Sequence, residues 1–227
     1  MAEITRHTLT GIYGGTFDPI HYGHLRIAEE LTDILALNHL SFLPAGQPRL
    51  RLPPFVTGKH RVAMLQEAIR GNTRFSVDDR EVRRPGDTYS VESLREIRQE
   101  YETNESVALC FIIGADAFIK LPYWYRWREL FELCHLIIVN RPGSDPIRYP
   151  SDLPEELRNI CQDRWVTMAD ELKNSPLGLI FTASTILLDI SSTKIRNIIA
   201  SGKSARYLLP EPVLNYIDEH GFYAGGK

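Results

Sequence analysis

The sequence predicts an α/β protein with a single doubly wound, mostly parallel β-sheet and helices on both faces of that sheet. Apolar runs of strand length alternate with amphipathic helical patterns along the 227 residues, and this order is typical of parallel strands joined by crossover helices. Several runs are apolar throughout, as strands buried on both faces are. A glycine-rich turn follows the first run, where sheets of this kind bind ligands.

The expected strands are short apolar runs, at positions 9–13, 40–43, 75–77, 107–113, 136–139 and 179–181. The expected helices carry apolar residues every three or four positions, at 23–35, 59–69, 90–101, 127–133 and 192–201. Proline-containing stretches at 47–57 and 142–154 indicate loops. Because both are too short for a domain linker, we expect one domain over residues 1–227.

Composition describes an ordinary globular protein, with 43% hydrophobic and 24% charged residues. The net charge of −3 and the lack of a basic run argue against nucleic acid as a partner. The sequence has neither an apolar run long enough for a membrane span nor a signal-peptide core, so we expect no membrane association. The three cysteines form no C-x-x-C pair, which favours a reducing compartment, the cytoplasm. No feature of the sequence fixes the oligomeric state.

The first predicted strand runs into a glycine turn, residues 14–24, with the sequence GGTFDPIHYGH. Glycines let backbone N–H groups approach an anion, and the helix that follows adds the positive end of its dipole. His21 and His24 would lie side by side on the first helical turn, facing the same phosphates. This segment predicts a nucleotide-phosphate site, where a triphosphate would favour charged imidazoles. The alternatives are histidines that only cap or pack the turn, and half of a metal site, which no Cys, Asp or Glu completes.

A second helix start of this kind lies at residues 190–196, with the sequence ISSTKIR. Ser191, Ser192 and Thr193 suit a helix N-terminus that faces the β- and γ-phosphates, and Arg196 would reach them from one turn further along. Local spacing alone favours a simple serine cap. Lys194 is expected to point to solvent.

Two segments between these motifs have open interpretations. Asp116 follows the most apolar predicted strand and would accept hydrogen bonds from ribose hydroxyls, cap the next short helix, or do both. Residues 122–127, PYWYRW, contain four aromatic side chains in five positions, which normally indicates core packing.

These segments resemble the H-x-G-H nucleotidyltransferase superfamily, and more narrowly the nicotinate mononucleotide adenylyltransferase family. The glycine turn and the 190–196 segment are superfamily motifs, which pantetheine-phosphate adenylyltransferases and cytidylyltransferases share. Residues 111–116, 122–125 and 135–143 carry the narrower resemblance, which extends from about Thr10 to Tyr223. It implies a Rossmann-like nucleotidyltransferase fold and transfer of AMP from ATP to nicotinate mononucleotide, with release of pyrophosphate. The Mg²⁺ that such chemistry uses would be bound mainly through substrate phosphates.

The resemblance also implies residue roles. His24, with His21 beside it, would stabilise the transferring phosphate. The α-phosphate region would be held by Thr16 and by the backbone amides of Gly15 and Phe17. On the acceptor side, the residues that would bind the mononucleotide are Tyr89, Ser90, Trp124, Tyr125 and Arg141. Among these, Trp124 would stack on the nicotinate ring and Arg141 would contact the phosphate.

The sequence departs from the family pattern in two places. The loop at residues 44–51 has no histidine where many members have one, so Arg49 or Arg51 would supply the positive charge. Ser90 stands where a threonine is usual, and this change keeps the hydroxyl. The rival functions are transfer to nicotinamide mononucleotide or to another acceptor such as phosphopantetheine, and non-catalytic nucleotide binding. Neutral donors near Tyr89 and Ser90 favour an acceptor that carries a carboxylate over one that carries an amide.

Overall fold

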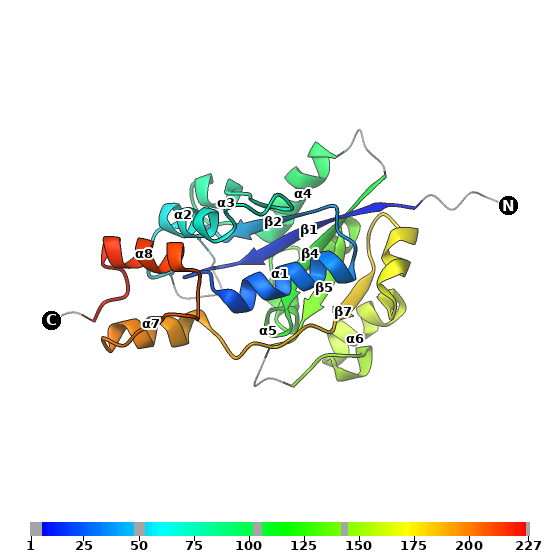
Figure 1. The fold of residues 1–227 in the computed structure, drawn as a ribbon. Coiled ribbons are helices and arrows are strands. Elements are labelled where there is room, and N and C mark those ends of the chain that lie inside the picture. Colours follow the sequence, from blue (N-terminus) through cyan, green and yellow to red (C-terminus); the bar gives the residue numbers. More distant parts are fainter. Residues whose placement is uncertain (1–5, 48–52, 102–105, 142–144, 226–227) are drawn as a thin grey trace.

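The computed structural model describes residues 6–47, 53–101, 106–141 and 145–225. It contains one seven-stranded sheet in the order β3-β2-β1-β4-β5-β7-β6, in which every pairing is parallel (Figure 1). The strands are β1 Thr8–Gly15, β2 His39–Pro44, β3 Phe75–Val77, β4 Val107–Gly114, β5 His135–Val139, β6 Trp165–Val166 and β7 Ile180–Ala183. The predicted parallel α/β fold is therefore confirmed, with β6 added at the edge.

Most predicted helices form within a residue or two of the expected bounds. The α-helices are α1 Tyr22–Ile34, α2 Gly58–Ala68, α3 Arg80–Arg83, α4 Ser90–Glu100, α5 Ala115–Phe118, α6 Glu155–Cys161, α7 Ser192–Ala200 and α8 Glu211–His220. In the part of the chain that the structure describes, five 3₁₀ helices complete the set, namely η1 Leu121–Tyr123, η2 Trp127–Glu132, η3 Pro150–Asp152, η4 Gln162–Arg164 and η5 Ala169–Asn174. Within the described residues, no helix is both long enough and apolar enough to cross a bilayer.

The structure differs from the expected helices in several places. The segment predicted as an α-helix at 127–133 is the 3₁₀ helix η2, with the i→i+3 bonds Glu129 N to Arg126 O at 3.0 Å and Leu133 N to Leu130 O at 3.1 Å. Such helices are favoured in short connections. The loop predicted at 142–154 contains η3 near its end. The predicted ranges also omitted the short helices α3, α5 and α6 and the longer α8, although Val213, Leu214 and Ile217 are buried along one face of α8.

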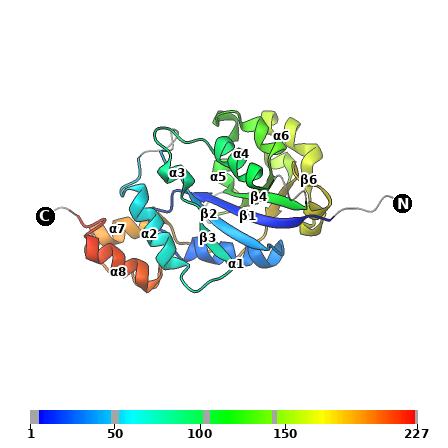
Figure 2. The same ribbon diagram turned by 90° about the horizontal axis from the view of Figure 1, so that it is seen from above.

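The core has two layers because side chains alternate across each strand. In β4, Ala108, Cys110 and Ile112 pack in the cluster beneath α1, α2, α7 and α8, whereas Leu109 and Phe111 pack in the cluster beneath α4, η2 and α6. Figure 2 shows α4 and α6 on one side of the strands and α1 on the other. Burial on both faces explains why β4 is apolar along its whole length.

The direction of winding reverses between β1 and β4. From β1 the chain builds outward through β2 and β3, and it then returns to place β4 on the other side of β1. Ligands bind at such a switch point, beyond the carboxyl ends of the strands. At that end of the sheet lie α2, α7 and α8 (Figures 1 and 2). The fold therefore brings the glycine turn after β1 and the segment after β4 to one place.

Candidate active site

A cavity of about 1000 Å³ opens beyond the carboxyl ends of β1 and β4. Every site residue predicted from the sequence lines it except Asp116. Asp116 is exposed at the second position of α5, whose N-cap is Gly114, so its expected role as the helix cap is wrong. Its carboxylate lies 3.7 Å from Nε of Arg141, which does line the cavity. The fold thus gathers segments from residue 13 to residue 196 around one space.

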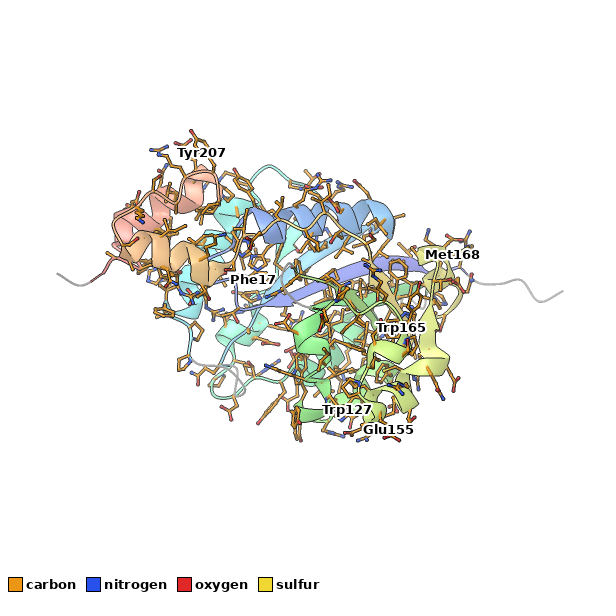
Figure 3. The ribbon with its side chains drawn as sticks, turned by 90° about the horizontal axis from the view of Figure 1, so that it is seen from below. Phe17, Trp127, Glu155, Trp165, Met168 and Tyr207 are labelled. Carbon is orange, nitrogen blue, oxygen red and sulfur yellow. The ribbon has the colours of Figure 1, made fainter. Side chains whose placement is uncertain are left out.

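Two glycines of the turn are required by neighbouring aromatic rings. A Cβ on Gly15 would lie 2.7 Å from Cζ of Phe17, and one on Gly14 would lie 2.9 Å from Cε2 of Phe111. Phe17 has a left-handed backbone, with φ of 49°, and its ring packs edge-on against Tyr13, with 5.6 Å between centroids. Figure 3 shows Phe17 beside the carboxyl end of β1. The Phe17 side chain is therefore a core anchor, which leaves its backbone as the part available to a ligand.

His21 and His24 stack on each other, with ring centroids 3.7 Å apart and planes inclined by 26°. This confirms that the pair lies side by side at the start of α1, where His21 occupies the N-cap position. Nδ1 of each ring is buried and has no hydrogen-bond partner within the described residues. Because an unpaired buried nitrogen costs about 1–3 kcal/mol, this arrangement is expected where a ligand supplies the missing partner.

Burial keeps both imidazoles neutral in the unliganded protein. Loss of hydration, with a smaller contribution from the charge of Arg141, lowers the pKa of His21 to about 3. Burial, then His21, then Arg141 lower the pKa of His24 well below its usual value. A nearby polyphosphate would oppose these effects, because negative charge favours the imidazolium. An anion bound beside the pair would therefore raise the pKa of both imidazoles.

Sequence patterns gave no sign of Arg61, a buried arginine on α2 that braces the glycine turn. Its guanidinium donates from Nη1 to the carbonyl of Thr16 at 2.8 Å and from Nη2 to that of Ala45 at 2.6 Å. Burial lowers the pKa of Arg61, and the nearby Asp18 opposes this effect. Arg61 occupies an ordinary polar position in a helical pattern, so only the tertiary structure reveals its role.

The N-terminus of α7 is tied directly to the glycine turn. Ser191 is its N-cap and accepts from the Lys194 backbone at 3.2 Å, while Ser192 Oγ donates to the carbonyl of Pro19 at 2.8 Å. Arg196 Nη1 donates to the carbonyl of Asp18 at 2.6 Å. The predicted serine cap is confirmed, and the start of α7 also faces the cavity, where phosphate binding stays a prediction. The exposed Lys194 side chain pairs with Asp189.

The opposite wall of the cavity is aromatic. Tyr89 and Tyr125 have ring centroids 4.6 Å apart, and the half-buried Trp124 lies edge-on to Phe111 at 6.5 Å. Trp127, in contrast, is only 4% exposed and packs in the core. The cluster predicted at 122–127 is thus divided, because Trp127 alone takes the core role and Trp124 and Tyr125 line the cavity.

A buried acid, Glu81, also lines the cavity and was missed from the sequence. Its carboxylate accepts from Ser93 Oγ at 2.9 Å and from the Gly46 backbone at 3.3 Å. Burial raises the pKa of Glu81, and these hydrogen bonds oppose that effect. It joins the loop after β2 to α4. The loop arginines Arg49 and Arg51, expected to approach the phosphates, lie outside the described residues.

Comparison with known proteins shows the family of the chain. Residues 12–198 match the profile of the Cytidylyltransferase-like family. A probable nicotinate-nucleotide adenylyltransferase of Dechloromonas aromatica is 44% identical over 213 residues, 94% of this chain and 96% of that protein. A protein of the same description from Methylococcus capsulatus is 43% identical over 217 residues, 95% of this chain and 100% of the relative.

Solved structures support the fold. The Plasmodium falciparum nicotinic acid mononucleotide adenylyltransferase complexed with NaAD superposes with a TM-score of 0.66 over 96% of this chain and 98% of that one, at 17% identity. From the stacked histidines at the switch point, the profile match and the sequence identities, it follows that the chain belongs to the nicotinate-nucleotide adenylyltransferase family of the cytidylyltransferase-like nucleotidyltransferases.

Proposed function

We propose that this protein transfers AMP from ATP to nicotinate mononucleotide, forming nicotinate adenine dinucleotide and pyrophosphate in NAD biosynthesis. A phosphate oxygen of the mononucleotide attacks the α-phosphorus of ATP, the new P–O bond forms, and the bond to the β-phosphate oxygen breaks as pyrophosphate leaves. This reaction requires alignment and charge neutralisation, and no nucleophilic side chain. The observation that carries the proposal is the stacked pair His21 and His24, whose buried Nδ1 atoms lack partners within the described residues.

On the ATP side, His24 and His21 stabilise the transferring phosphate. Thr16 and the backbone at Gly15 and Phe17 hold the α-phosphate region. The β- and γ-phosphates lie at the N-terminus of α7, where the binding residues are Ser191, Ser192, Thr193 and Arg196. What supports this assignment is that the two helix N-termini face one cavity and are held together by the bonds from α7 to Asp18 and Pro19.

On the acceptor side, Trp124 stacks on the nicotinate ring, with Tyr125 close by. Tyr89 and Ser90 contribute to recognition of the carboxylate, and Arg141 binds the mononucleotide phosphate. Asp116, beside Arg141, accepts hydrogen bonds from ribose hydroxyls at the cavity edge. The aromatic wall and the Arg141–Asp116 pair, at 3.7 Å, support this arrangement.

Mg²⁺ that accompanies ATP would neutralise charge on the substrate phosphates, and the protein would hold it mainly through those phosphates. Within the described residues no three His, Cys, Asp or Glu side chains form a metal site, and Asp18 in the cavity wall already accepts two hydrogen bonds at 2.6 Å each. A cation that keeps its waters and binds substrate phosphates fits such a cavity. We also propose a cytoplasmic location, no nucleic-acid partner and one domain over residues 1–227.

The test is pyrophosphate release with ATP and either nicotinate or nicotinamide mononucleotide as acceptor. We expect at least about a hundredfold higher kcat/KM for the acid, because an amide NH₂ would face donors that suit a carboxylate, at a cost of several kcal/mol. Equal efficiencies would overturn the acceptor assignment and leave adenylyl transfer standing. Phosphopantetheine serves as the control acceptor. Binding of ATP without pyrophosphate release in the presence of any of these acceptors would indicate a non-catalytic binding protein.

A further inference from the structure

Asp18, inside the glycine turn, joins four separate segments of the chain. Its carboxylate accepts from the backbone of Phe55 through Oδ2 and from the hydroxyl of Tyr223 through Oδ1, both at 2.6 Å. Its carbonyl accepts from Arg196 at 2.6 Å. The Arg196 guanidinium also lies over the Phe55 ring, 4.4 Å from the centroid. Asp18 is buried, so these contacts act in a region of low dielectric, where they are strong.

Tyr223 reaches this position from the segment that follows α8. Its backbone is left-handed, with φ of 62°, a conformation that residues other than glycine keep only where their surroundings fix it. Close by, a Cβ on Gly225 would lie 2.5 Å from the carbonyl oxygen of Ala200, so the segment passes tightly against the end of α7. Burial and the Asp18 carboxylate both raise the pKa of Tyr223, which keeps its hydroxyl protonated and able to donate.

We propose that Tyr223 is a positioning residue for ATP, which acts by fixing Asp18 and, through the Asp18 carbonyl, Arg196. The hydroxyl of Tyr223 and the amide of Phe55 hold the Asp18 carboxylate from two sides, so the backbone that receives Arg196 cannot rotate freely. The two helix N-termini that face the cavity, those of α1 and α7, are thereby kept at a fixed separation. This inference rests on the proposed function for its assignment of the phosphates.

The network is confined to one side of the cavity. Phe55, Asp18 and Arg196 line it, and Tyr223 stands behind them outside the lining. The acceptor wall at Tyr89 and Trp124 contacts other aromatic rings instead. If Tyr223 had a purely structural role, removing its hydroxyl would lower the stability of the protein and would weaken the binding of both substrates alike. If Tyr223 has a positioning role, removing its hydroxyl weakens the binding of ATP and leaves the binding of the mononucleotide unchanged.

The test compares Tyr223→Phe with Tyr216→Phe, a matched control from the same part of the chain. The Tyr216 hydroxyl bonds Nδ1 of His60 at 2.9 Å, and neither residue lines the cavity. We expect Tyr223→Phe to raise the Kd for a non-hydrolysable ATP analogue and the KM for ATP by about tenfold, the effect of losing one hydrogen bond to a charged group. The KM for nicotinate mononucleotide should change less than about twofold, and Tyr216→Phe should leave all three values unchanged.

A second variant, Asp18→Asn, keeps the measurement decisive if Tyr223→Phe does not fold. We expect it to show the same ATP-selective loss. In the double variant the two losses should not add, because both changes weaken the contact between Asp18 and Tyr223. Three outcomes would overturn the proposal. Tyr223→Phe would bind the ATP analogue as tightly as the wild type, or it would lose affinity for both substrates equally. In the third, the losses of ATP affinity in the double variant would be additive. Binding of the ATP analogue is measured without an acceptor, so failure of the wild-type protein to adenylate nicotinate mononucleotide would refute the proposed function separately.

Discussion

The two halves of the cavity differ in how much of their geometry exists before a substrate arrives. On the phosphate side, Asp18 and His21 are each 4% exposed, and Arg61 and Arg196 are bonded to backbone carbonyls. On the acceptor side, Tyr125 is 50% exposed and Tyr123 is 77% exposed. Preorganised polar groups stabilise developing charge at little reorganisation cost, whereas an open aromatic wall gains its burial from the ligand. Catalysis should therefore depend mainly on the first half, and acceptor choice mainly on the second.

The sharpest test of this difference is His24→Ala. Removing one charge-stabilising group commonly costs about 3–4 kcal/mol of barrier, so we expect kcat to fall by about two to three orders of magnitude. His39→Ala is the control, since this partly buried imidazole bonds Ser76 at 2.8 Å and does not line the cavity. Thermal unfolding of both variants separates lost packing from lost catalysis. Turnover near the wild-type value in His24→Ala would remove the residue from the mechanism.

A smaller effect is expected for Arg196→Ala. We expect the Kd for ATP to rise by about 30-fold, or about 2 kcal/mol, because this is the range for the loss of a charge-assisted hydrogen bond. Affinity for nicotinate mononucleotide should be nearly unchanged. Trp124→Ala should show the opposite pattern, because its ring belongs to the acceptor wall. Calorimetric titration of each variant with each ligand checks both. If Arg196→Ala loses affinity only for the mononucleotide, Arg196 binds the mononucleotide phosphate and not the triphosphate of ATP.

The smallest expected effect concerns acid stability. Since burial lowers the pKa of His21 to about 3, the unfolded chain takes up a proton below about pH 6.5 while the folded protein does not. Proton uptake by His21 in the unfolded chain lowers the free energy of unfolding. This loss is absent well above pH 6.5 and grows as the pH falls toward 3. Between pH 7.5 and 5.5 His21 should account for about 1.4 kcal/mol of lost unfolding free energy.

Urea denaturation at both pH values measures this loss, and His21→Gln should show correspondingly less pH dependence. His135→Gln is the comparison, because burial also lowers the pKa of His135, to about 4, but its ring bonds Ser175 and Leu179 and lies outside the cavity. A saturating ATP analogue should reduce the contribution of His21 to the pH dependence of the unfolding free energy. The contribution of His135 should remain unchanged. Identical pH dependence in the wild type and His21→Gln would contradict the prediction.

The sequence revealed most of the phosphate side, because strand, glycine turn and helix follow one another within a few residues. Their local order determines their geometry, and His21 and His24 pair through helix spacing alone. Arg61, Glu81 and Tyr223 were beyond this reasoning, because each acts through partners more than 10 residues away in the sequence. The roles within the aromatic segment 122–127 could not be predicted individually, because nothing in its local pattern separates the buried Trp127 from the cavity-facing Trp124. The sequence pattern also did not distinguish the 3₁₀ helix η2 from an α-helix.

The switch point between β1 and β4 also has a consequence for folding kinetics. Tyr13 pairs with Ile112 across that junction, so the central strands meet only after a long stretch of chain has been closed into a loop. Loop closure of this length carries an entropic cost, and parallel pairings of high sequence separation form slowly. The glycine turn and the acceptor wall come together only when that pairing is complete. Recovery of activity during refolding will therefore follow the late, long-range steps and will lag behind the appearance of helical structure.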